Sequence, residues 1–92
     1  MNNHFLYREN NSKLNALRGW LFYAPLTLEG VLSTIQANVE TLPDSEYREF
    51  LVEFHNDLLA IQDISALVKW YEQMEDPQFQ EVARILKTRL NS

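Results

Sequence analysis

Prolines divide this sequence into four segments, and in each of them apolar residues recur every three or four positions. Pro25 and Pro43 disfavour helical geometry in the residue before them, so each is expected to end a helix. Pro77 follows Asp76, and a capping residue followed by proline is typical of a helix start. No segment alternates apolar and polar residues with a period of two. The pattern predicts an all-α fold, a small up-and-down helical bundle of about four helices with a long central third helix.

The first helix is predicted to begin near Asn11 or Ser12 and to run towards Tyr23. Residues 1–11 before it are expected to form a loosely ordered N-terminal segment of a single domain spanning 1–92. Gly19 weakens the interior of this helix by about 1 kcal/mol relative to Ala. The missing side chain would offset this loss of helix stability if it allowed another part of the backbone to come close to Gly19.

The second and fourth helices carry one apolar face each. Thr27 is expected to cap the second, whose apolar stripe consists of Leu28, Val31, Leu32, Ile35, Val39 and Leu42. The apolar face of the fourth consists of Phe79, Val82, Ala83, Leu86 and Leu90. Cations in the last turns of the fourth helix, where the helix dipole favours them, are Arg84, Lys87 and Arg89.

The third helix is predicted to start at Asp44 or Ser45 and to be the central element. Neither Gly nor Pro interrupts residues 45–75, which favours one continuous helix. The alternative is a break near Gln62, with Asp63 capping a new helix. Its apolar arc is wider than one stripe, because further apolar residues occur at Leu59, Ile64, Leu67, Trp70 and Met74. An arc of that width is typical of a helix that lies between neighbours.

Composition indicates an ordered protein of the cytoplasm. Apolar residues make up 46% of the 92 residues and charged residues 23%, which is ordinary for a globular domain. The chain has no cysteine, so disulfides, zinc–thiolate sites and thiol nucleophiles are excluded. The start lacks the pattern of a secretory signal. The apolar run at 20–24 is far too short to cross a bilayer, so no membrane partner is expected.

Charge is concentrated in the middle of the chain, whose net charge is −5. Residues 40–76 hold ten acidic residues against two basic ones, Arg48 and Lys69. Nucleic-acid binding needs a basic stripe that displaces counterions, so direct nucleic-acid binding is not expected. A partner protein with a basic surface suits this distribution better.

Catalytic and metal-binding patterns are missing from the sequence. A ligand partner for His55 would lie one helical turn away, and those positions are Leu51, Val52, Leu58 and Leu59. The other histidine, His4, lies in the N-terminal segment. The two glycines are too few for a phosphate loop, and no serine lies in a G-x-S-x-G motif. We therefore expect no enzyme activity, no metal and no cofactor.

An acidic ridge, defined as Glu46, Glu49, Glu53 and Asp57, recurs along one side of the third helix. Like charges at this spacing cost a few tenths of a kcal/mol per pair, so the ridge does not stabilise the isolated helix. It is interpreted either as a solvated face that keeps the protein soluble or as a docking strip for a basic protein surface.

An aromatic patch is predicted from a dense run of rings around Trp20, Phe22 and Tyr23. Successive helical residues point about 100° apart, so these side chains cannot all enter the core that Leu17 and Leu21 enter. The rings pack under other elements or form an exposed contact site. Trp70 presents the same alternatives, and the two clusters are one if the first helix packs beside the third.

The leading hypothesis is a non-enzymatic protein-binding module, regulatory or inhibitory, that docks on a basic partner through the acidic ridge and the aromatic patch. One alternative is a structural homodimer that buries its aromatic surface against its own copy. A second alternative is a carrier of a small apolar ligand held between helices.

Overall fold

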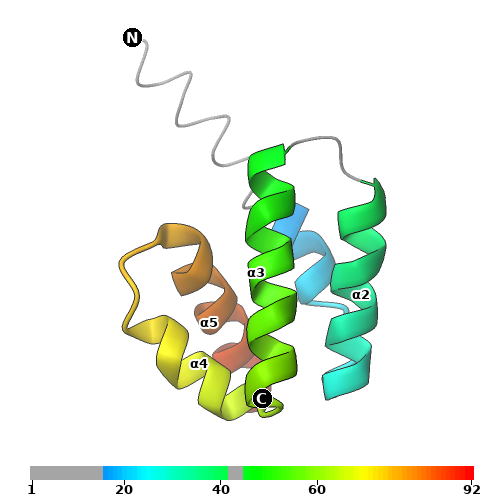
Figure 1. Cartoon of the computed structure of the whole chain (residues 1–92). Coiled ribbons are helices and arrows are strands. Elements are labelled where there is room, and N and C mark those ends of the chain that lie inside the picture. The colour runs from blue at the N-terminus through cyan, green and yellow to red at the C-terminus, as the bar shows by residue number, and fades with distance from the viewer. Residues whose placement is uncertain (1–15, 42–44) are drawn as a thin grey trace, which may run out of the picture.

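The computed structural model describes residues 16–41 and 45–92, and every regular element within them is an α-helix (Figure 1). A helical stretch at 16–21 is followed by α2 (Leu28–Thr41), α3 (Ser45–Ile61), α4 (Ile64–Glu72) and α5 (Pro77–Leu90). The α2 and α3 helices lie side by side and antiparallel, and α4 and α5 form a second pair beside α3 (Figure 1). The prediction of a small all-α bundle is confirmed. The predicted N-terminal segment 1–11, the start of the first helix and the positions of Leu42 and Asp44 lie outside the described residues.

The single long third helix predicted from the sequence is wrong, because the chain breaks at Gln62 and Asp63. Gln62 has a left-handed backbone with φ of 57°, while its N–H donates to the Leu58 carbonyl at 2.8 Å. Asp63 is extended, and its side chain accepts from the N–H of Ala66 at 3.2 Å, which caps α4. The break near Gln62 is therefore the alternative that holds. A left-handed helix end is usually glycine, and here glutamine takes that place, so composition did not indicate the turn.

Two predicted helix starts are confirmed by their caps. Thr27 Oγ1 accepts from the N–H of Gly30 at 3.0 Å before α2. Asp76 Oδ1 accepts from the N–H of Gln78 at 2.8 Å, and Pro77 occupies the first turn of α5. Each cap satisfies a backbone donor that the helix itself leaves without a partner.

A close backbone approach occurs at Gly30 and not at Gly19. A Cβ built on Gly30 would lie 2.6 Å from Pro25 Cβ and 2.7 Å from Pro25 O, so a side chain there would collide with the preceding loop. A Cβ on Gly19 would meet no atom of the described residues within 4 Å. The missing side chain thus allows the turn before α2 to fold back onto the first turn of that helix.

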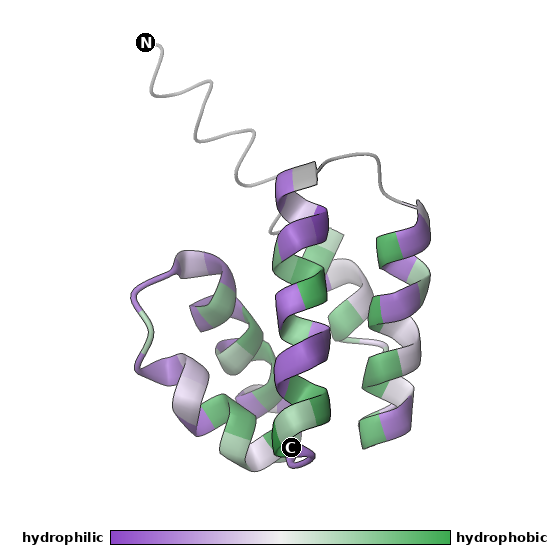
Figure 2. Ribbon diagram, viewed as in Figure 1, coloured by the Kyte–Doolittle hydropathy of each residue, from purple (hydrophilic) through white to green (hydrophobic). Residues whose placement is uncertain are grey.

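The core lies where α3, α4 and α5 face one another, and aromatic rings fill its centre. The Phe79 ring on α5 lies 5.0 Å from Phe50 and 4.7 Å from Tyr71, both in edge-on geometry. Phe54 lies 6.0 Å from Tyr71. Most residues of the predicted inner faces are buried or half-buried, and hydrophobic residues lie on the facing sides of the helices (Figure 2), but Leu90, predicted on the apolar face of the fourth helix, is 40% exposed at the end of α5. Further fully buried side chains from every helical part are Leu17, Leu21, Val31, Ile35, Leu51, Leu58, Leu67, Val82, Ile85 and Leu86.

The stretch 16–21 is tied to α5 by Glu81, a charged residue that is only 8% exposed. Glu81 Oε2 accepts from Arg18 Nε at 2.9 Å and from Arg18 Nη2 at 2.5 Å, while Oε1 accepts from Arg84. Burial alone would raise the pKa of the Glu81 carboxyl. The hydrogen bonds and charges of Arg84 and Arg18 outweigh burial, so this pKa lies below its ordinary value.

Arg89 provides a second tie between the same two elements. Its Nη1 donates to the Leu21 carbonyl at 3.1 Å and to the Ala24 carbonyl, where the first helical stretch ends. These carbonyls have no helical partner of their own, and a guanidinium supplies a charged donor for them. Arg89, one of the cations predicted to complement the dipole of α5, therefore also binds the end of the helical stretch at 16–21.

Candidate partner-binding surface

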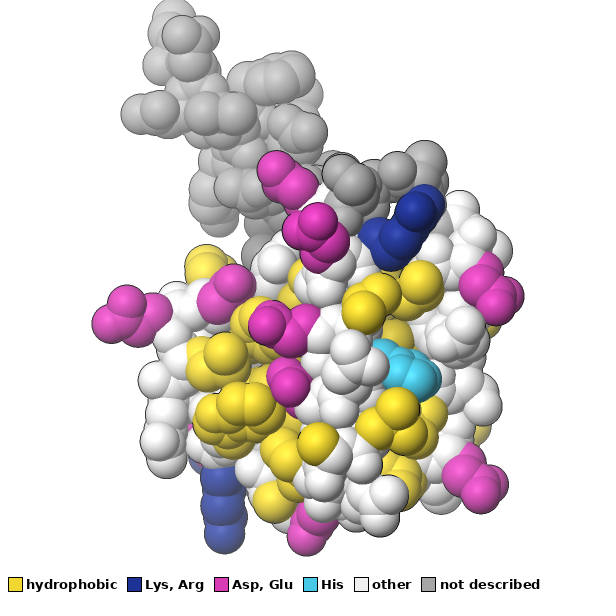
Figure 3. Space-filling model, viewed as in Figure 1, with side chains coloured by type: hydrophobic (Ala, Val, Ile, Leu, Met, Phe, Trp, Pro, Cys, Tyr) yellow, Lys and Arg dark blue, Asp and Glu magenta, His cyan; other side chains and the backbone are white. Residues whose placement is uncertain are grey.

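The acidic ridge follows α3 down the outer side of the molecule, where carboxylate side chains form a column (Figure 3). Glu46, Glu49 and Glu53 are exposed. Glu49 and Glu53 form no hydrogen bond or ion pair within residues 16–41 and 45–92. Neither carboxylate is therefore neutralised by an ion pair of the described fold.

Asp57, the last member of the ridge, is half-buried and takes part in the internal packing. Its Oδ2 accepts from the hydroxyl of Tyr71 at 2.7 Å, and Tyr71 is fully buried on α4. Burial raises the pKa of the Tyr71 hydroxyl, and the hydrogen bond and charge of Asp57, with the charge of Glu53, raise it further. The phenol remains a donor, so Asp57 joins α3 to α4 while the three glutamates face solvent.

The aromatic run at 20–23 divides between the core and the surface. Trp20 is half-buried, packs against the core and donates from Nε1 to the Tyr47 hydroxyl at 3.4 Å. Phe22 and Tyr23 lie in the turn that follows and are 37% and 85% exposed. Trp20 thus packs against the core, whereas Phe22 and Tyr23 are exposed.

Trp70 is 43% exposed on α4. Its ring lies 5.6 Å from that of the buried Tyr71, at an angle of 44°, while much of the indole remains at the surface. Trp20 is hydrogen-bonded to the Tyr47 hydroxyl at the start of α3, whereas the ring of Trp70 lies beside that of Tyr71 on α4. The sequence left open whether Trp70 forms one cluster with the run at 20–23, and the described contacts give Trp20 and Trp70 different neighbours.

Two apolar residues on α3 were missed as surface candidates. Val52 is 42% exposed and Leu59 is 46% exposed. Leu59 was expected to widen a buried arc, but no helix of the described part covers it. A helical wheel would have shown the difference, because Val52 and Leu59 lie roughly 130° around the helix from the buried face.

Shallow hollows lie along α3, and one of them is lined by Val52. The α3 hollow, of about 510 Å³, is lined by Arg48, Glu49, Val52, Glu53, Asn56 and Asp57. The α2–α3 hollow, of about 400 Å³, is lined by Leu32, Ser33, Gln36, Ala37, Glu40 and His55. A third hollow, between the starts of α3 and α5, adds Asp76 to the carboxylates of Glu46, Glu49 and Glu53. Carboxylates outnumber cations around these surfaces.

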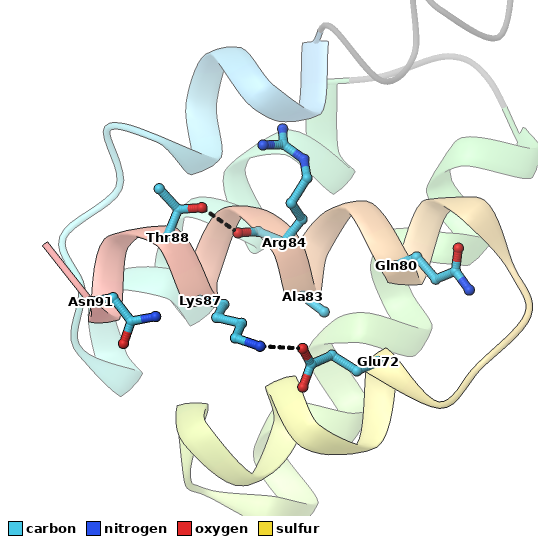
Figure 4. Close-up of a pocket in the computed structure, with 7 residues that line it drawn as sticks. All are labelled: Glu72, Gln80, Ala83, Arg84, Lys87, Thr88 and Asn91. Carbon is cyan, nitrogen blue, oxygen red and sulfur yellow. Dashed lines mark hydrogen bonds and ion pairs between the residues drawn. The ribbon is translucent and has the colours of Figure 1, made fainter.

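The hollow between α4 and α5 has a different character (Figure 4). Lys87 Nζ points toward Glu72 and pairs with its Oε2 at 2.9 Å. Arg84 points toward the first helical stretch, and it pairs with Glu81 one turn earlier on α5. Both cations lining this hollow are thus engaged within the fold, so it offers no preformed anion site.

His55 is half-buried in the wall of the α2–α3 hollow. Within residues 16–41 and 45–92, no group of three or more His, Cys, Asp or Glu side chains is arranged to hold a metal ion. On the outer side of α3, exposed carboxylates lie beside exposed apolar side chains.

None of the helices in the described part is both long and apolar enough to cross a membrane. Comparison with known proteins gave no match to a family model, a curated protein or a solved structure.

Proposed function

We propose that this chain is a non-enzymatic protein-binding module, regulatory or inhibitory, that docks on a basic surface of a partner protein through the outer face of α3. The observation that supports it is the pair Glu49 and Glu53, which are exposed and have no partner within the described residues. They stand one turn apart beside the exposed Val52. A cationic partner surface would relieve their repulsion and cover the apolar side chain. The chain has no cysteine, which suits the reducing cytoplasm, where we propose that it acts.

The function is tested by capture with a charge-reversed variant. Wild-type protein, E49K/E53K and the control E29K/E75K are immobilised and exposed to lysate of the native cells. Each Glu→Lys changes the charge by +2, so both double variants shift the net charge from −5 to −1. Glu29 and Glu75 are exposed residues of α2 and of the loop before α5. Overall charge is thereby matched, and only the position of the change differs.

We expect a protein that wild type and the control retain and that E49K/E53K loses. With that partner purified, the Kd should rise at least about tenfold for E49K/E53K, equivalent to about 1.4 kcal/mol. Binding should also weaken as salt is raised, because the screening length falls from about 8 Å at 0.15 M to about 3 Å at 1 M. If every retained protein binds both double variants equally, the acidic face is only a solvated surface and the proposal is wrong.

The exposed aromatic residues favour one alternative, a homodimer. Tyr23 is 85% exposed and Trp70 43% exposed. Light-scattering mass across a concentration range distinguishes the cases, since a monomer has 10.9 kDa and a dimer twice that. Tyr23→Ser and Trp70→Gln are the useful variants, because Trp20 supports the core and its removal would disturb folding in either case.

A further inference from the structure

The outer side of α3 carries a second apolar face that the bundle leaves uncovered. Val52 and Leu59, which we name the α3 stripe, are 42% and 46% exposed. They are seven residues apart, so they lie about 10.5 Å apart along the helix axis on nearly the same side. The buried face of α3 is formed by Tyr47, Leu51, Phe54 and Leu58, on another side of the helix. The α3 stripe is therefore not an edge of the core.

The surroundings of the α3 stripe are asymmetric in charge. On one side the α3 hollow has three carboxylates, those of Glu49, Glu53 and Asp57, against the guanidinium of Arg48. On the other side the α2–α3 hollow is lined by Leu32 and Ala37 together with the polar side chains of Ser33, Gln36 and His55, and Glu40 is its one carboxylate. Figure 3 shows hydrophobic side chains on this face next to the acidic column. An occupant would therefore meet Val52 and Leu59 with an acidic border on one side and a mainly uncharged border on the other.

We propose that the α3 stripe binds a basic amphipathic helix of a partner protein. This inference rests on the proposed function and specifies the class of partner. Apolar residues at i and i+7 of an incoming helix repeat with the same spacing as Val52 and Leu59, as in helix-in-groove recognition. Lysine or arginine on one flank of that helix would face Glu49 and Glu53.

Two other occupants fit less well. An extended peptide is recognised mainly through backbone hydrogen bonds to a sheet edge, and the helices α2 and α3 use their backbone groups internally. A second copy of this chain would bring its own acidic border against Glu49 and Glu53, in a protein of net charge −5. Charge complementarity thus selects a basic helix.

The test uses a labelled peptide of leucine and lysine, about 18 residues or five turns long, with leucine on one helical face. Two controls are a leucine–glutamate peptide of the same pattern and a leucine–lysine peptide rearranged to alternate with period two. Binding is followed by fluorescence anisotropy, peptide helicity by circular dichroism, and the contact surface by amide chemical shifts. The protein variants are V52Q/L59Q and, as a matched control, L90Q, which changes a residue 40% exposed at the end of α5.

We expect the amphipathic leucine–lysine peptide to become helical on binding and to shift the amides of α3 around Val52 and Leu59. V52Q/L59Q should raise its Kd at least about tenfold, while L90Q leaves it unchanged. No binding, or equal binding of V52Q/L59Q and wild type, would overturn the inference. If E49K/E53K nevertheless loses the partner captured from lysate, the proposed acidic docking face is supported. Only the inference that the α3 stripe binds a helix is then wrong. A doubled mass that V52Q/L59Q returns to monomer would instead assign the stripe to a second copy.

Discussion

The two glycines of this chain lie in helices, yet Gly→Ala should have opposite effects on stability at these two positions. At Gly19 the added methyl meets no described atom within 4 Å. Alanine there gains helix propensity over glycine, about 1 kcal/mol. We therefore expect Gly19→Ala to raise the free energy of unfolding by up to about 1 kcal/mol.

At Gly30 the same methyl would lie 2.6 Å from Pro25 Cβ, 2.7 Å from Pro25 O and 2.9 Å from Thr27 Oγ1. The proline ring and the backbone carbonyl cannot rotate away as the end of a long side chain would. Overpacking of this kind costs about 1–3 kcal/mol. Moving Thr27 would also weaken the cap bond that its Oγ1 accepts from the Gly30 N–H, worth about 1 kcal/mol. These losses exceed the gain in propensity, so Gly30→Ala should destabilise the protein by about 1–3 kcal/mol.

The assay is urea and thermal unfolding of both variants and wild type, followed by circular dichroism. For a domain of this size about 1 kcal/mol corresponds to a shift in Tm of about 4–8 °C, so the two variants should lie clearly on either side of wild type. Gly30→Ser serves as a further check, because it adds the same Cβ. A Gly30→Ala protein as stable as Gly19→Ala would refute the close packing of the loop at Pro25 against α2.

Three further predictions concern single contacts. Gln62→Gly should stabilise the protein by about 0.5–1 kcal/mol in urea unfolding, because glycine adopts a φ of 57° without the steric cost that glutamine bears. Glu81→Gln should cost about 1–3 kcal/mol at neutral pH by weakening the bonds from Arg18 and Arg84. The folded pKa of Glu81 is lowered, so its stabilisation is present above the unfolded value of about 4.3 and is lost as pH falls through the folded pKa. Unfolding measured from neutral to acid pH should show a shallower loss for Glu81→Gln than for wild type, and parallel curves would contradict this. Tyr71→Phe removes the donor to Asp57 and should cost about 1 kcal/mol in thermal unfolding, with an unchanged Tm as the contrary result.

Surface candidates were predictable from the sequence only in part. The spacing of Glu46, Glu49 and Glu53 placed them on one outer side of a helix, because a helical period is a local property. Asp57 belongs to the same series, but whether it faces solvent depends on Tyr71 arriving from α4. The exposure of Val52 and Leu59 likewise depends on which sides of α3 its neighbours occupy. Spacing along one helix says nothing about the position of a helix that follows a turn.

The sequence by itself determined the helical class, most of the inner faces and the starts of α2 and α5, because apolar periodicity, Thr27 and Asp76–Pro77 act through contacts within a few residues. Only the tertiary structure decided the break at Gln62, because no glycine in the sequence indicates its left-handed backbone. The break also lets α4 turn and pack against α5. The tertiary structure likewise decided that Glu81 is buried between Arg18 and Arg84, and that Arg89 binds the carbonyl of Leu21, where the first helical stretch ends, and that of Ala24, 65 residues earlier in the chain. A charge is buried only where cations from distant parts of the chain offset its desolvation, and their arrival is set by the packing of whole helices.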